Sequence, residues 1–382
     1  MILRSDLAHW TGWNVAVTGM NLSTVKPGRP AVGAAVARCL RELPVYRGRV
    51  IGLGCGTLDP GLYYTEAWGE TCDAGYVLPD PAAGAGALMQ RLSDILRHQR
   101  IDAIIPCQDA ELPHFIKLAP ALGRLGVRVL LPTPQSLERC APQRLPELGT
   151  ATGILTPRVT RIDGASFLEH WASLAAGAWV RPLVIRSAAH GACLVHTPVQ
   201  ARQRLAQMAG TPEDPLLTQD YVPGVDLTLT ALGDGSGALI GPVMLQKQPT
   251  YSEQGNAWVG VTIDHPPLLA AGERLMQELR WRGPLEMRMR SDPQGLLHLI
   301  GIVPHFPAWV HLSHAVGRNL PAALLALLQE VQPVRLEFAA PRPGMRFIGT
   351  AHDGAVRPAA PARCVAGARS AAGLASDGQL IA

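Results

Sequence analysis

The sequence has no Cys-x-x-Cys pair, no run of lysine or arginine, and no long apolar stretch. Its seven cysteines are scattered, which predicts neither a zinc site nor a disulfide framework, so we expect reduced thiols. A net charge of +4 without a basic cluster argues against a nucleic-acid partner. No segment approaches the roughly 18 consecutive apolar residues of a membrane span, and MILRSDLAHWTGW lacks the apolar core of a signal peptide. We therefore expect a cytoplasmic protein that does not contact a membrane.

Hydrophobic residues make up 47% and charged residues 17% of the 382 residues, which is typical of a soluble globular protein. A chain of this length has room for about two or three subdomains. In its first third, NVAVTG (14–19), RVIGLGCG (49–56) and VRVLLPTP (127–134) have the apolar pattern of strands. AGALMQRLSDILRHQRI (85–101) has the spacing of an amphipathic helix. The alternation of strands and helices predicts a parallel sheet covered on both faces.

The glycines of GLGCG (52–56) match only part of a dinucleotide-binding loop. Thr57 stands where the GxGxxG pattern needs its third glycine. We interpret these glycines as parts of tight turns between strands and helices.

Three segments follow one another in the second half of the chain. They are QDYVPGVDLTLTAL (219–232), GALIGPVMLQKQPT (237–250) and RGPLEMRMRSDPQGLLHLIGIVPHFPAWVHLSHAVGRNLP (282–321). This order resembles the ATP-binding half of the ATP-grasp superfamily, in particular the branch of the carbamoyl-phosphate synthase large chain and the carboxylate–amine ligases. The resemblance covers roughly residues 14–321. It implies an α/β protein with the ATP-grasp fold: an N-terminal Rossmann-like pre-ATP-grasp domain, a small lid subdomain and a larger α+β C-terminal subdomain.

The resemblance also predicts the domain boundaries. Residues 1–134 form the pre-ATP-grasp domain and residues 135–340 the ATP-grasp domain, with the lid at about 156–218 and the C-terminal half at 219–340. Residues 341–382 are rich in Ala, Gly and Arg without periodicity, and we predict a disordered tail.

Several residues match positions that bind the nucleotide in the superfamily. Arg186 lies on the predicted lid strand, where a basic residue contacts phosphate; alternatively it is an arginine on a sheet surface. The loop that follows, SAAHGAC (187–193), has only one glycine and looks shortened. The resemblance assigns the adenine-binding hinge to Asp220, Tyr221 and Val222, the ribose to Asp226, and a further basic contact to Lys247. Asp226 read by itself is equally compatible with an exposed strand carboxylate.

In the superfamily the metal ligands are a Gln or acidic residue, a Glu and an Asn. Here Arg288, Gly301 and Val303 occupy these positions, and His305 occupies that of a phosphate-binding Arg. Gly and Val offer no side-chain oxygen, and Mg²⁺ prefers hard oxygen ligands. The sequence therefore argues against magnesium, and we predict no metal ligand.

Two compensations are conceivable. Glu286 lies two residues before Arg288 and shares its strand face, so it either replaces a metal ligand or pairs with Arg288. Alternatively Arg288, Arg290 and His305 form a cationic pocket for an anion. His305, His311 and His314 lack a standard zinc spacing.

DAIIPCQDAEL (102–112) predicts a strand followed by a loop and the start of a helix, and its acidic part occupies a place that faces the active site in the superfamily. Gln108, Asp109 and Glu111 therefore face a ligand, or Asp109 caps a helix.

Our first hypothesis is a protein that has lost the usual Mg-binding residues and binds a nucleotide or another ligand in a biosynthetic pathway, with ATP as the implied cofactor. The alternative is an active ATP-dependent carboxylate–amine ligase that forms C–N bonds through an acyl phosphate. Expected partners are a small-molecule or peptide carboxylate and a biosynthetic partner protein, and a homodimer is plausible.

Overall fold

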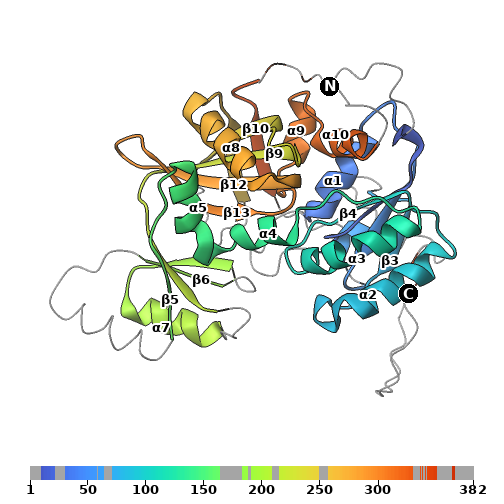
Figure 1. The fold of residues 1–382 in the computed structure, drawn as a ribbon, viewed down its shortest axis with the longest axis horizontal. Helices are drawn as coiled ribbons and strands as arrows, with labels where there is room; N and C mark the ends of the chain where they lie inside the picture. Colours follow the sequence, from blue (N-terminus) through green and yellow to red (C-terminus); the bar gives the residue numbers. More distant parts are fainter. Residues whose placement is uncertain are drawn as a thin grey trace.

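The structure is a computed structural model of the chain. It describes residues 10–21, 31–57, 59–63, 71–163, 183–187, 191–208, 215–248, 257–329, 336, 338, 340, 342–350 and 364–365. These residues form three β-sheets with helices packed around them (Figure 1).

The N-terminal domain is built on a parallel sheet with the strand order β15-β3-β2-β1-β4, as the alternating pattern predicted. Its strands are β1 (Val15–Val17), β2 (Val50–Gly54), β3 (Ala74–Val77), β4 (Ala103–Ile105) and β15 (Cys364–Val365). Its helices are α1 (Val32–Arg41), α2 (Gly84–Leu96) and α3 (Leu112–Arg124), with single turns η2 (Pro60–Leu62) and η3 (Pro81–Ala83). Residues of α2 and α3 pack on one face of the sheet, and residues of α1 on the other.

The predicted strand at 127–134 is wrong in extent. Only Arg128 bridges to Ala103 of β4. Pro132 and Pro134 have no backbone N–H to donate, so the chain leaves the sheet here. It continues into α4 (Pro134–Arg139), η4 (Pro142–Arg144) and α5 (Leu145–Thr152).

The lid is a small antiparallel sheet with the order β5-β8-β6-β7. It contains β5 (Val159–Arg161), β6 (Leu183–Ser187), β7 (Gly191–Val195), β8 (Leu217–Asp220) and helix α7 (Pro198–Gln207). Ile185, Val195, Ala201, Met208 and Leu216 form its own small core. Residues 188–190 of the predicted short loop lie outside the described residues; Ser187 and Gly191 on either side of them pair directly.

The C-terminal half is built on an antiparallel sheet with the order β13-β12-β9-β10-β11-β14. Its strands are β9 (Val225–Asp234), β10 (Ile240–Gln248), β11 (Ala257–Thr262), β12 (Arg282–Ser291), β13 (Leu297–Val303) and β14 (Arg346–Thr350). Its helices are α8 (Pro266–Leu279), α9 (His311–Ala315) and α10 (Leu320–Leu327). The prediction of a disordered tail is wrong for Arg346–Thr350 and for Cys364–Val365, because the edges of β11 and β3 offer backbone partners to these segments.

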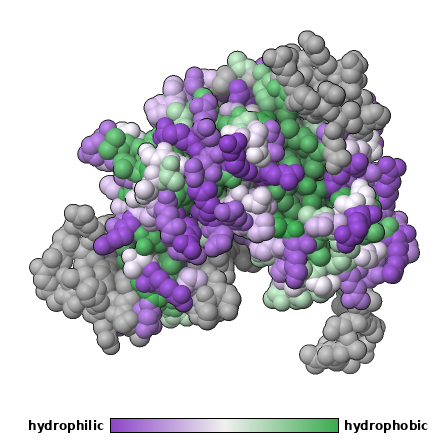
Figure 2. Space-filling model, viewed as in Figure 1, coloured by the Kyte–Doolittle hydropathy of each residue, from purple (hydrophilic) through white to green (hydrophobic). Residues whose placement is uncertain are grey.

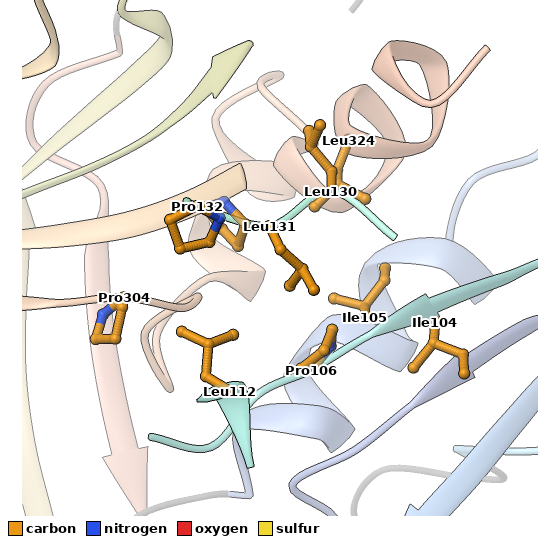
Figure 3. A pocket seen from close by; sticks show the side chains of 10 residues that line it. Ile104, Ile105, Pro106, Leu112, Leu130, Leu131, Pro132, Pro304 and Leu324 are labelled. Atoms are coloured by element: carbon orange, nitrogen blue, oxygen red, sulfur yellow. The ribbon is translucent and has the colours of Figure 1, made fainter. Parts of the chain in front are cut away.

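The N-terminal domain and the C-terminal half share one core. Val36 and Leu40 of α1 belong to the same buried cluster as Val243 of β10 and Leu324 of α10. Figure 3 shows part of the apolar seam between the two domains. Its lining residues are Ile104, Ile105, Pro106, Leu112, Leu130, Leu131, Pro132, Pro284, Pro304 and Leu324.

Hydrophobic side chains also reach the surface as a band on the face shown in Figure 2, with hydrophilic ones on both sides. Within the described ranges, no helix is long and apolar enough to cross a membrane.

Candidate functional site

The two faces of the C-terminal sheet have different chemistry because side chains alternate along each strand. Leu285, Met287 and Met289 of β12 pack in the core that includes residues of α8. Glu286, Arg288 and Arg290, which alternate with them, therefore lie on the opposite face, as the sequence predicted. Residues of β9 and β10 add Asp226, Thr228 and Lys247 to this polar row.

Glu286 lies at the centre of the polar row and is 2% exposed. Its Oε1 accepts hydrogen bonds from Thr228 Oγ1 and Trp309 Nε1, both at 2.9 Å, and lies 3.8 Å from Lys247 Nζ. Its Oε2 accepts a 2.9 Å hydrogen bond from Arg288 Nε. Burial raises the pKa of Glu286, but Arg288, Lys247 and the two hydrogen bonds outweigh it and hold the pKa well below its usual range. Glu286 is thus an ionised carboxylate that is already surrounded by donors.

The strand pairing places the residues that the resemblance assigned to the metal positions beside this network. Arg288 pairs with Gly301, and Glu286 pairs with Val303. The next pair is Met289 with Leu299, so Ile300 is an extra residue that forms a β-bulge. The bulge gives the Ile300 carbonyl two lid partners: Arg186 Nη1 at 3.1 Å and Gln219 Nε2 at 3.2 Å.

Arg186 reaches from β6 of the lid across to the C-terminal half. Its Nη1 also donates to Gln219 Oε1 at 2.8 Å, and its Nε is buried without a hydrogen-bond partner. Burial and, to a lesser extent, the nearby charge of Arg288 together lower the pKa of Arg186 to about 10. A Cβ atom placed on Gly301 would lie 3.9 Å from Arg186 Nη2, so the Arg186 side chain stands directly over the Gly301 position.

The hinge between lid and C-terminal half is occupied by Arg290. Its Nε donates to Asp226 Oδ1 at 2.6 Å, its Nη1 donates to the Val222 carbonyl at 2.7 Å, and its guanidinium lies over the Tyr221 ring at 4.8 Å. Burial lowers the pKa of Arg290, but the hydrogen bonds to Asp226 and Tyr221 and the charge of Asp226 leave the pKa raised. Asp220 is exposed, and its Oδ2 lies 3.7 Å from Arg158 Nε.

The proposed pocket of Arg288, Arg290 and His305 is not formed as predicted. Arg290 binds the hinge, and His305 lies 3.5 Å from Asp109 Oδ1 of the N-terminal domain while its Nδ1 contacts the Phe306 carbonyl. The alternation of side chains along β12 predicts the sheet face on which Arg290 lies. It does not predict that Arg290 binds Asp226 and the Val222 carbonyl.

The other two histidines contact helix α1 instead. His311 Nε2 lies 2.7 Å and His314 Nε2 3.7 Å from Glu42 Oε2. In the part of the chain that the structure describes, no group of three or more His, Cys, Asp or Glu side chains could hold a metal ion.

Glu111 is the residue of the acidic segment with the most unusual surroundings. It precedes α3, is 3% exposed, and has an Oε2 atom that is buried without a hydrogen-bond partner. Cys55 Sγ lies 3.7 Å from its Oε1. Burial raises the pKa of Glu111 to about 7 against the opposing hydrogen bonds of Thr18 and Cys55. The alternative role of Asp109 as a helix cap is wrong, because the N-cap of α3 is Glu111, whose side chain makes no cap hydrogen bond.

The sequence reasoning missed Gln219, Thr228 and Trp309, which complete the site. Gln219 and Thr228 belong to the segment 219–232, next to the residues that the resemblance assigned to the nucleotide. Trp309 is 23 residues from Glu286 in sequence, and only the folded structure brings the two side chains together.

By sequence, neither a protein-family model nor a curated protein matches the chain. Solved structures do match it. The L-amino acid ligase from Bacillus licheniformis is 14% identical with a TM-score of 0.55, covering 84% of this chain and 74% of that one. Biotin carboxylase from Campylobacter jejuni is 12% identical with a TM-score of 0.56, covering 88% and 75%. N5-carboxyaminoimidazole ribonucleotide synthetase from Thermotoga maritima is 13% identical with a TM-score of 0.54, covering 88% and 79%. These similarities, together with the three sheets, show that the chain has the ATP-grasp fold that the motifs predicted.

Proposed function

We propose that this chain is a ligand-binding protein with the ATP-grasp fold that does not carry out magnesium-dependent phosphoryl transfer. The observation that supports it best is the chemistry of the superfamily's metal positions. Arg288 is a cation, and Gly301 and Val303, which pair with Arg288 and Glu286, have no side-chain oxygen.

Glu286 does not restore the magnesium site. A carboxylate that binds Mg²⁺ must turn its oxygens toward the ion. Both oxygens of Glu286 already accept hydrogen bonds, from Thr228 and Trp309 on one side and from Arg288 on the other. Magnesium would also have to lie beside Arg288 and Lys247, which repel it. The residues present therefore do not fit the metal, and we derive no step through it.

The expected ligand is an anion, either a nucleotide or a carboxylate of a small molecule or peptide. Arg186, Arg288 and Lys247 supply the positive charge for it. We also propose that the protein acts in the cytoplasm within a biosynthetic pathway, beside a partner protein and as a homodimer. Light scattering of the purified protein would measure its oligomeric state.

The decisive test is ATP turnover. Purified protein is incubated with ATP, Mg²⁺ and mixtures of carboxylates and amines, and phosphate release is measured. We expect no release above the protein-free background. Turnover that depends on Mg²⁺ and is lost in Glu286→Gln would overturn the proposal in favour of the carboxylate–amine ligase, with Glu286 as its metal ligand.

A further inference from the structure

The lid places the partly buried guanidinium of Arg186 over the C-terminal sheet. Among the described residues, no carboxylate oxygen lies within ion-pair distance of Arg186. Its partners are the neutral oxygens of Gln219 and Ile300, and its Nε has none. A buried ion without a counter-ion is costly, and an anion that binds beside it recovers part of that cost.

Arg288 increases this excess of positive charge. It pairs with Glu286, but Glu286 is shared with Lys247, so one carboxylate faces two cations. Arg288 also acts on Arg186 through its charge. Two guanidinium groups close enough to affect each other's charge are suited to an oxyanion, because each offers several N–H donors in one plane.

Arg186 and Arg288 both lie next to Gly301. Gly301 pairs with Arg288 in the sheet, and a Cβ atom placed on it would meet nothing closer than Arg186 Nη2 at 3.9 Å. Gly301 therefore contributes no side chain beside Arg186 and Arg288.

The hinge, in contrast, is already filled by the protein itself. Arg290 donates hydrogen bonds to the Val222 carbonyl and the Asp226 carboxylate, and its guanidinium lies over the Tyr221 ring. These are the hydrogen-bond acceptor, the flat apolar surface and the hydroxyl acceptor that a nucleoside would need. A nucleoside could use them only by displacing a guanidinium held by a 2.6 Å charged hydrogen bond.

We propose that Arg186 and Arg288 form a metal-free oxyanion site above Gly301 that binds a phosphate group, while Arg290 keeps a nucleoside base out of the hinge. This rests on the proposed function and makes it specific: the ligand is recognised through its phosphate and not through its base. Phosphate groups of a nucleotide and of a smaller metabolite share this chemistry, and the probes below separate them.

The test is calorimetric titration of the full-length protein with pyrophosphate, ATP and adenosine, each in EDTA and in Mg²⁺. We expect pyrophosphate to bind in EDTA, ATP to bind within about threefold of pyrophosphate, and adenosine not to bind. Arg290→Gln should tighten ATP relative to pyrophosphate by about tenfold, because it frees the hinge.

Gly301→Glu is the sharpest variant. The new carboxylate lies beside Arg186 and Arg288, supplies the missing counter-ion and repels the ligand, so pyrophosphate affinity should fall at least about tenfold. Gly301→Gln adds nearly the same volume without the charge, so it measures the steric part of the loss; its pyrophosphate affinity should fall at least about threefold less than that of Gly301→Glu. Thermal unfolding of both variants verifies that they are folded.

Three outcomes would overturn the inference: no pyrophosphate binding in EDTA, equal affinity in Gly301→Glu and Gly301→Gln, or adenosine binding as tightly as ATP. None of these outcomes produces ATP turnover, so each leaves the proposed function standing. Turnover of ATP in the preceding assay would in turn remove the proposed function without deciding how the anion is held.

Discussion

Glu111 is a single residue whose ionisation opposes folding. Its pKa is raised from 4.5 to about 7 because the folded chain buries it. The folded state therefore holds the proton more tightly than the unfolded state. The associated stability is fully present below about pH 4.5 and is lost as the pH rises through about 7.

Glu111→Gln tests this linkage because an amide cannot ionise. Between pH 4.5 and 8, the free energy of unfolding of the variant should rise relative to the parent by about 3 kcal/mol, from about 1.4 kcal/mol per pKa unit. Denaturant unfolding at several pH values measures it. A parallel pH dependence in parent and Glu111→Gln would contradict the raised pKa.

Glu286 shows what residue patterns could and could not predict. The alternation of β12 placed Glu286 and Arg288 on one face, and their ion pair is one of the two roles the sequence left open for Glu286. The sequence could not predict that Trp309 and Thr228 would also bind this carboxylate, because those contacts depend on tertiary packing. For the same reason the sequence could not separate His305 from His311 and His314, which contact different elements of the N-terminal domain.

At the scale of elements, the bulge in β13 is the feature that joins lid and sheet. Without the extra residue Ile300, the carbonyl that receives Arg186 and Gln219 would take part in the ladder between β12 and β13. The segment LIGIV has no insertion that would reveal a bulge, so its position was inaccessible from the sequence. The order of strands and helices was accessible, because it follows from apolar periodicity and from the resemblance.

Gln219→Ala should loosen the lid without unfolding the rest. Gln219 is 4% exposed and links Arg186 to the Ile300 carbonyl, so its loss removes hydrogen bonds worth about 1 kcal/mol each. Losing both bonds should accelerate amide hydrogen exchange in β6 and β8 by roughly thirtyfold, while β1 and β2 stay unchanged. Gln207→Ala, at the exposed end of α7, is the matched control. Equal exchange rates in the two variants would show that the Ile300 carbonyl does not hold the lid.

At the scale of the whole molecule, the buried hydrophobic residues are divided unevenly between the lid and the two larger parts. The lid packs a small cluster of its own, formed by Ile185, Val195 and their neighbours. The N-terminal domain and the C-terminal half instead share the cluster that contains Leu40 and Leu324, although the sequence analysis treated them as separate domains. Motifs can only predict boundaries along the chain. Which parts unfold together depends on buried contacts between segments that are distant in sequence.

This shared core predicts that the two large domains unfold together. Leu324 is 1% exposed and lies on the seam, so Leu324→Ala removes apolar contacts from both sides of it. Buried Leu→Ala substitutions cost about 2–5 kcal/mol. We expect calorimetry to show one main transition that moves to lower temperature as a unit. Exchange in β1 and in β9 should accelerate by the same factor, because both strands are protected by the same global opening. A variant in which β9 loses protection while β1 keeps it would mean that the seam is only a contact surface. The anion site between lid and sheet would then be supported by the C-terminal half alone.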